Sequence, residues 1–220
     1  MGAPEAADRP ALPADVDRLL HDLRGPLNAA VMHLELCKRL GPDDAEAARC
    51  LDTAQQALTR LAQLLPLAFE IVALEPRERV RVDLRALVEG TRRTPGLERV
   101  TLAEGPWPDV HGDRRLLALA LTHLLRNAVE ATEAAGGECP PPRVGAAREG
   151  HSVVVSVRDW GRGFRGASPK SLLRLTASTK PAAAGVGLLT ALRVARLHGG
   201  GLELVAPPGG GAEVRLRLRA

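Results

Sequence analysis

The chain has 220 residues, of which 45% are hydrophobic and 25% are charged, a balance typical of soluble globular proteins. The formal net charge is only +4 and aromatic residues make up 2%, so a nucleic-acid-binding surface of clustered basic and aromatic side chains is not expected. No apolar run approaches the roughly 20 residues of a membrane-spanning helix, and the opening residues lack the order of a signal peptide. We therefore expect a cytoplasmic protein without membrane insertion.

The first third of the chain carries a helical pattern. Residues 1–13 are polar and rich in proline and alanine, so we expect a disordered tail there. From residue 14 onward, apolar residues recur at steps of three and four, in two runs separated by Gly41-Pro42. This pattern predicts an antiparallel helical hairpin over residues 14–75. A single hairpin cannot bury both apolar stripes, which predicts a homodimer packed as a four-helix bundle.

Residues 76–220 follow a different pattern, in which short runs of β-branched and aliphatic residues alternate with helical stretches. The expected strands are Val80–Leu84, Val100–Ala103, Ser152–Arg158, Leu202–Val205 and Val214–Leu218. The expected helices are Leu84–Thr91, Arg114–Ala135 and Val186–Leu197. Strands mixed with helices indicate an α/β sandwich, so the fold class of the whole chain is α+β.

The first helix contains a histidine next to a carboxylate, His21-Asp22, within the segment LLHDLRGPLNAA. A neighbouring carboxylate can accept one ring N–H of a histidine, which leaves the lone pair of the other nitrogen free to attack. By itself, such a pair on a helix is more often a solvated surface feature. Its interpretation therefore depends on the second half of the chain.

The second half contains residue types that suit a nucleotide. Asp159 ends a strand and offers an acceptor next to Gly161 and Gly163, where the backbone can approach a flat ring closely. Gly185 and Gly187 open a helix, whose free N–H groups bind phosphates. Asn127 offers an amide oxygen, a hard ligand suited to Mg²⁺ that keeps waters and phosphate oxygens. Each feature is common, and only their order along the chain is specific.

Taken in order, HDLRGP, NAVEA, DWGRG and GVG resemble the motifs of bacterial sensor histidine kinases. The resemblance implies a dimerisation and phosphoacceptor hairpin followed by an ATP-binding domain of the Bergerat fold, shared with gyrase and heat-shock chaperones. It implies His21 as the phosphoacceptor with Asp22 as acid or base, ATP and Mg²⁺ as cofactors, and the receiver domain of a response regulator as partner. The residues that it places on the nucleotide are Asn127, also the Mg²⁺ ligand, Asp159, Gly161, Gly163, Thr179, Lys180, Gly185 and Gly187.

Three positions depart from the family pattern. His123 replaces the first asparagine before Asn127, LLRLTAS replaces a phenylalanine-rich stretch, and Gly25 stands where many relatives carry Thr or Asn for dephosphorylating their partner. The rival hypothesis is a dimeric phosphotransfer adaptor whose ATP-binding domain no longer binds nucleotide. The retained Asn127, Asp159 and glycines argue against it. Because only a short tail precedes the hairpin, we expect an upstream sensor or input protein to act in trans.

The remaining histidines carry no metal-ligand spacing. His33, His111 and His151 fit exposed or turn positions. His198 stands near the end of a predicted helix, where a positive charge would be favourable. We expect no catalytic role for any of the four.

Overall fold

The structure is a computed structural model that describes residues 14–40, 44–164, 169–175 and 186–220. The chain divides into two compact units, Met1–Leu65 and Pro66–Ala220. The division falls inside the second helix, earlier than residue 75, where the sequence predicts the end of the hairpin.

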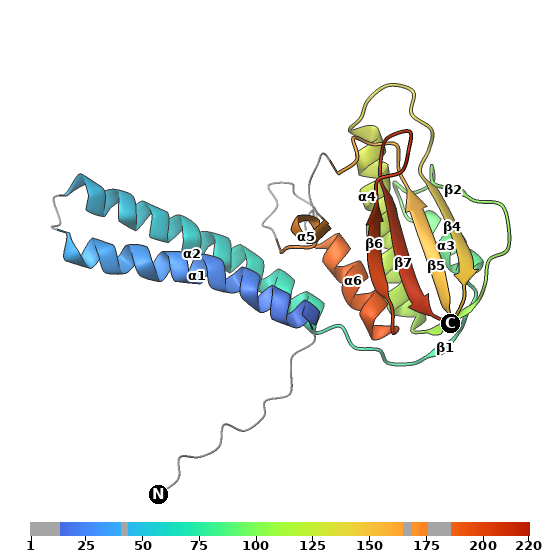
Figure 1. Cartoon of the computed structure of the whole chain (residues 1–220), viewed down its shortest axis with the longest axis horizontal. Coiled ribbons are helices and arrows are strands. Elements are labelled where there is room, and N and C mark those ends of the chain that lie inside the picture. The colour runs from blue at the N-terminus through green and yellow to red at the C-terminus, as the bar shows by residue number, and fades with distance from the viewer. Residues whose placement is uncertain (1–13, 41–43, 165–168, 176–185) are drawn as a thin grey trace, which may run out of the picture. The chain divides into compact units, whose positions relative to one another are not determined.

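Two long helices form the hairpin, α1 (Ala14–Arg39) and α2 (Ala45–Val72), the second of which begins after Asp44 (Figure 1). Asp44 Oδ1 accepts the N–H of Glu46 at 2.8 Å and so caps the start of α2. One stripe of each helix is buried within the hairpin: Leu19, Ala30, Ala47, Cys50, Ala54 and Leu64.

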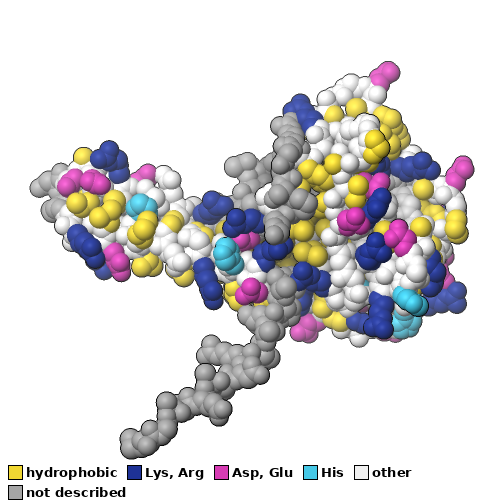
Figure 2. All heavy atoms as spheres, in the orientation of Figure 1, with side chains coloured by type: hydrophobic (Ala, Val, Ile, Leu, Met, Phe, Trp, Pro, Cys, Tyr) yellow, Lys and Arg dark blue, Asp and Glu magenta, His cyan; other side chains and the backbone are white. Residues whose placement is uncertain are grey.

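A second apolar stripe of the hairpin remains exposed. Its large members on both helices are between about a third and a half accessible to solvent: Leu20, Leu27, Val31, Leu34, Leu51 and Leu58. Figure 2 shows hydrophobic side chains along the surface of the hairpin. The predicted helical hairpin is confirmed, and one copy of it leaves apolar area uncovered.

After the end of α2, the described residues of the second unit form a mixed sheet, a separate pair of short strands and four helices. In chain order the elements are β1 (Val80–Val82), α3 (Leu84–Arg92), β2 (Thr101–Leu102), β3 (Val110–Gly112), α4 (Arg114–Glu133), β4 (Arg143–Glu149), β5 (Ser152–Arg158), α5 (Pro169–Leu172), α6 (Gly187–Leu197), β6 (Gly201–Val205) and β7 (Glu213–Arg219). The main sheet has the strand order β2-β4-β5-β7-β6, in which only the β2–β4 pair is parallel. Strands β1 and β3 form a separate antiparallel pair.

The core of this unit lies between the main sheet and helices α3, α4 and α6 (Figure 1). Alternate residues of β5, namely Val153, Val155 and Val157, are buried and point to the same side of the sheet. Leu116, Leu121 and Leu125 of α4 and Val194 of α6 belong to the same buried cluster. This packing fixes the starts and ends of α4 and α6 relative to the strands.

The α+β fold class is confirmed, while several boundaries differ from expectation. The first predicted strand stops at Val82 because Asp83 caps α3, accepting the N–H of Ala86 at 2.9 Å. Strands β3 and β4 were not expected: β3 has three residues, and β4 contains Gly145 and two alanines. No described helix is long and apolar enough to cross a membrane.

Candidate active site

A pocket of about 270 Å³ lies between α4, β5, β7 and the start of α6. Asn127, Glu130 and Ala131 of α4 and its C-cap Ala134 line it on the same side of the helix. The other walls come from the sheet and the adjoining segments: Val157, Asp159, Gly163, Phe164, Leu188, Ala212 and Val214.

Asp159 supplies the buried carboxylate of the pocket and is only 7% exposed. Its Oδ1 accepts two backbone N–H groups, from Gly161 at 2.8 Å and from Ala212 at 3.1 Å. No described residue donates to Oδ2, which leaves that oxygen for a ligand. Burial raises the pKa of Asp159, against the opposing effects of the two N–H groups and of the Arg158 charge.

Two glycines after Asp159 allow close backbone packing. A Cβ on Gly161 would lie 2.6 Å from the carbonyl oxygen of Ala131 in α4. Gly163 has a positive φ of 61°, and its Cβ would lie 2.7 Å from the carbonyl oxygen of Gly211. Because these two residues have no side chain, the segment after β5 can pack directly against the backbone of α4 and of the β6–β7 turn.

Asn127 lies next to the first residue of α6. A Cβ on Gly187 would lie 3.3 Å from Asn127 Nδ2 and 3.4 Å from His123 Nδ1, so both side chains face the start of this helix. The N-cap residue Val186 offers no side-chain hydrogen bond to the free N–H groups. Burial and the Arg126 charge lower the pKa of His123, while the Glu70 charge opposes them. The ring is therefore neutral near pH 7.

The histidine of the first helix is open to solvent, with 74% of its side chain exposed, whereas only 4% of the Asp22 side chain is exposed. His21 Nδ1 and Asp22 Oδ1 are 3.7 Å apart. This distance is too long for a hydrogen bond, so the expected tautomer-fixing bond is not formed here. The carboxylate is still close enough to stabilise positive charge on the ring.

The metal that the sequence implies fits the donor chemistry of the pocket. Within the described residues, no three His, Cys, Asp or Glu side chains form a group that could hold a metal. Mg²⁺ in nucleotide sites usually takes one or two protein ligands and completes its shell with waters and phosphates. Asn127 of α4, whose side chain lies beside the start of α6, is a ligand of that kind.

Two family models match the chain. Residues 16–65 match the His Kinase A (phospho-acceptor) domain, and residues 112–220 match the histidine kinase-, DNA gyrase B- and HSP90-like ATPase. The chain belongs to the sensor histidine kinases. The phosphoacceptor match contains His21, and the ATPase match contains the whole pocket lining.

Curated histidine kinase relatives are longer than this chain. The nitrogen regulation protein NtrY of Azorhizobium caulinodans is 32% identical over 98% of this chain and 30% of its own length. The C4-dicarboxylate transport sensor protein DctS of Rhodobacter capsulatus is 34% identical over 76% of this chain and 23% of its own length. The kinase core therefore spans less than a third of either relative.

Solved kinase structures share the fold. Histidine kinase AdeS of Acinetobacter baumannii superposes with a TM-score of 0.53 at 17% identity, over 90% of this chain and 97% of AdeS. The ATP binding domain of PrrB from Mycobacterium tuberculosis superposes with a TM-score of 0.50 at 26% identity, over 66% of this chain and 98% of that domain. Both agree with the Bergerat-type fold of the second unit.

The structure brings together part of the predicted nucleotide set. Asn127, Asp159 and Gly163 line one pocket, Gly161 borders it, and Gly187 faces Asn127. Thr179, Lys180 and Gly185 lie outside the described residues. Sequence reasoning missed Glu130, which lines the pocket one turn after Asn127. Its helical spacing from Asn127 could have identified it.

Proposed function

We propose that the chain is an ATP-dependent protein-histidine kinase that phosphorylates His21 and passes the phosphoryl group to an aspartate of a response regulator receiver domain. Asp159 carries this proposal: its Oδ1 is occupied by two N–H groups, and its Oδ2 is available in a pocket bordered by Asn127. Such an acceptor suits the amino group of adenine. The same geometry argues against an adaptor that has lost its nucleotide site.

In the proposed reaction, the unprotonated ring nitrogen of His21 attacks the γ-phosphorus of ATP. An N–P bond forms, the bond from the γ-phosphorus to the bridging oxygen breaks, and ADP leaves. The positive charge that develops on the ring is stabilised by the nearby Asp22 carboxylate, and the ring then loses its remaining proton. In the second step, a carboxylate oxygen of the regulator attacks phosphorus and the N–P bond breaks.

The start of α6 and Asn127 hold the phosphate end of the nucleotide in this proposal. Bound Mg²⁺, held through Asn127, would neutralise the phosphate charge. Thr179, Lys180 and Gly185 belong to the same end by family resemblance. We further propose a cytoplasmic homodimer, joined through the exposed stripe of the hairpin, that receives its input from an upstream sensor protein.

Radiolabelled ATP tests the assignment directly. Incubation with Mg²⁺ should label His21 through a bond that is labile to acid and stable to base. His21→Gln should abolish labelling, whereas the matched variant His33→Gln, on the same helix, should retain it. Equal labelling of the two variants would assign the phosphoryl group to another residue, and absence of nucleotide binding would favour the adaptor.

A further inference from the structure

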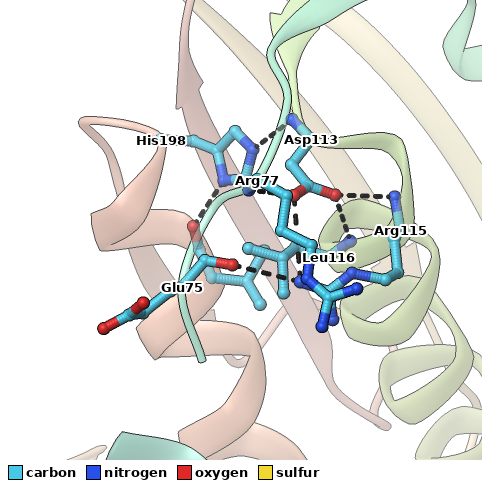
Figure 3. Close-up of polar contacts among 7 residues, drawn as sticks. Glu75, Arg77, Asp113, Arg115, Leu116 and His198 are labelled. Atoms are coloured by element: carbon cyan, nitrogen blue, oxygen red, sulfur yellow. Dashed lines mark hydrogen bonds and ion pairs between the residues drawn. The ribbon is translucent and has the colours of Figure 1, made fainter. Parts of the chain in front are cut away.

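The segment that joins α2 to β1, residues 73–79 (the connecting strap), is held mainly by polar contacts. All of its residues except Leu74 are exposed. Three hydrogen bonds attach it to the start of α4 and the end of α6, and Figure 3 shows the two to the start of α4. They run from Arg115 Nη2 to the Glu75 oxygen at 3.1 Å, from the Arg77 N–H to Asp113 Oδ2 at 2.9 Å, and from Arg79 Nη2 to the Leu197 oxygen at 2.6 Å.

Asp113 is the centre of this attachment and is 4% exposed. Its Oδ1 caps α4, accepting the N–H groups of Arg115 at 2.9 Å and Leu116 at 3.1 Å, while Oδ2 holds Arg77. Burial alone would raise the pKa of Asp113. The N–H groups of Arg77, Leu116 and Arg115 and the Arg115 charge outweigh burial and lower it. The side chain is therefore a carboxylate throughout the neutral range.

His198, 3% exposed at the end of α6, holds Asp113 from the other side (Figure 3). The backbone N–H of Asp113 donates to His198 Nε2 at 2.9 Å, and Nδ1 lies 2.7 Å from the Val194 oxygen. Since Nε2 accepts a proton, Nδ1 must carry one and donate it, so the ring is neutral. Gly112 packs against the ring: a Cβ there would lie 2.6 Å from its Cδ2.

We propose that Asp113 and His198 form a proton-sensitive clamp, which holds the connecting strap on α4 and α6 at neutral pH and releases it on acidification. A proton added at Nε2 would meet the Asp113 N–H, placing donor against donor. The ring cannot move toward β3, because Gly112 lies against it. The imidazolium can turn to the Asp113 carboxylate only by competing with Arg77 for Oδ2.

The surroundings of His198 set the direction of the pH response. Burial lowers the pKa of His198, as does the Arg79 charge on the strap, while the Val194 carbonyl and the Asp113 charge raise it. The net effect is a pKa below the ordinary value of 6.5. Arg219 of β7 also lies next to His198, and its backbone N–H donates a hydrogen bond to the His198 carbonyl oxygen at 3.1 Å. An unfolded or released histidine binds its proton more readily, so acidification below 6.5 favours release.

The clamp has a consequence for catalysis that rests on the proposed function. Helix α4 begins after its N-cap Asp113 and carries the pocket residue Asn127, and α6 runs from Gly187 to the clamp residue His198. The strap and the nucleotide pocket thus share both helices. Release of the strap would change how the hairpin is tethered to the nucleotide unit without removing any pocket residue.

Amide exchange of the full chain tests the clamp without relying on ATP. Loss of one hydrogen bond should change a local opening equilibrium about tenfold. The protection factor of the Arg77 amide should therefore fall about tenfold between about pH 7.5 and about pH 5.5, two values on either side of the ordinary histidine pKa. Amides in the middle of α4 should keep theirs. His198→Gln, which can accept from the Asp113 N–H but does not titrate, should make Arg77 protection independent of pH. The matched variant His111→Gln, exposed on β3, should behave as wild type.

Imidazole ¹⁵N spectra of the wild-type chain provide a second measurement in case His198→Gln fails to fold. They should show the Nδ1–H tautomer at neutral pH and a His198 titration midpoint that coincides with the loss of Arg77 protection. Three results would overturn the clamp. They are an Arg77 protection factor that stays constant over this pH range, a loss of Arg77 protection at a pH that does not match the His198 titration, and a simultaneous loss of protection throughout α4. Failure of ATP binding would instead affect only the proposed function.

Discussion

Replacement of Asp159 by asparagine should separate nucleotide recognition from folding. Asparagine keeps an Oδ1 that can accept the N–H groups of Gly161 and Ala212, which lie 2.8 and 3.1 Å from the carboxylate oxygen. Its amide nitrogen takes the place of Oδ2, so a donor replaces the acceptor that faces the ligand. The variant also removes a buried charge, and burial raises the pKa of that carboxyl. The free energy of unfolding is therefore not expected to fall.

The expected size of the effect follows from the bond that is lost. A hydrogen bond to a charged group contributes about 1.5–3 kcal/mol, so Asp159→Asn should raise the Kd for ATP about 10- to 100-fold. Asp159→Ala is the matched control, since it removes the acceptor of both backbone N–H groups as well. Each buried donor left unpaired costs about 1–3 kcal/mol, so the alanine variant should bind ATP weakly and also melt at a lower temperature.

Calorimetric titration gives the Kd for ATP and for inosine triphosphate, which lacks the amino group of adenine. The ratio of the two Kd values measures how strongly the pocket recognises that amino group. The wild type should prefer ATP, and Asp159→Asn should lose that preference while keeping its Tm. If Asp159→Asn bound both nucleotides with wild-type affinities and melted normally, the assignment of Asp159 to the adenine amino group would be refuted.

Three further predictions concern the hairpin and the phosphate end of the pocket. Leu58 is 45% exposed on the apolar stripe, so Leu58→Lys should convert a dimer into monomers at micromolar concentration by light scattering. Gln56→Lys, on an exposed face of α2 away from Leu51 and Leu58, should not. A Cβ on Gly187 would lie 3.3 Å from the Asn127 amide nitrogen. Gly187→Ala should therefore weaken Mg·ATP binding about fivefold, since this crowding costs about 1 kcal/mol. Gly201→Ala is the control, because a Cβ at Gly201 would have open space around it. Gly25 also has nothing within 4 Å of a Cβ, so Gly25→Thr should fold normally and increase phosphate release from the phosphorylated regulator, which the wild type should dephosphorylate poorly.

The sequence predicted the long helices, and it also predicted candidate nucleotide residues, part of which line one pocket, because both signals are local. The spacing of apolar residues marks α1, α2, α4 and α6, and the contacts of Asp159 with Gly161 lie within one short segment. Strand β4 was missed because Gly145 and its neighbouring alanines weaken the strand pattern. The strand is stabilised by backbone pairing with β5 along seven residues, which the side chains of β4 do not indicate.

The interpretation of His198 was wrong for a different reason. Its position near a helix end favoured a positive charge on general grounds, yet the ring is buried and neutral. The group that decides this, the Asp113 N–H, lies 85 residues away in the chain. No spacing rule connects two such positions, and the packing of α4 against α6 brings the start of one helix next to the end of the other.

The place of β7 in the sheet has a consequence for biosynthesis. This strand comes last among the elements but lies between β5 and β6, so the sheet order cannot be completed until it has been made. The residue just before it, Ala212, supplies one of the two N–H groups that hold Asp159. A nascent or truncated chain without this strand would leave two strand edges unpaired and the carboxylate half anchored. Acquisition of nucleotide binding should therefore be a late event in folding, and proteolysis that removes β7 should eliminate binding even if the helical hairpin survives.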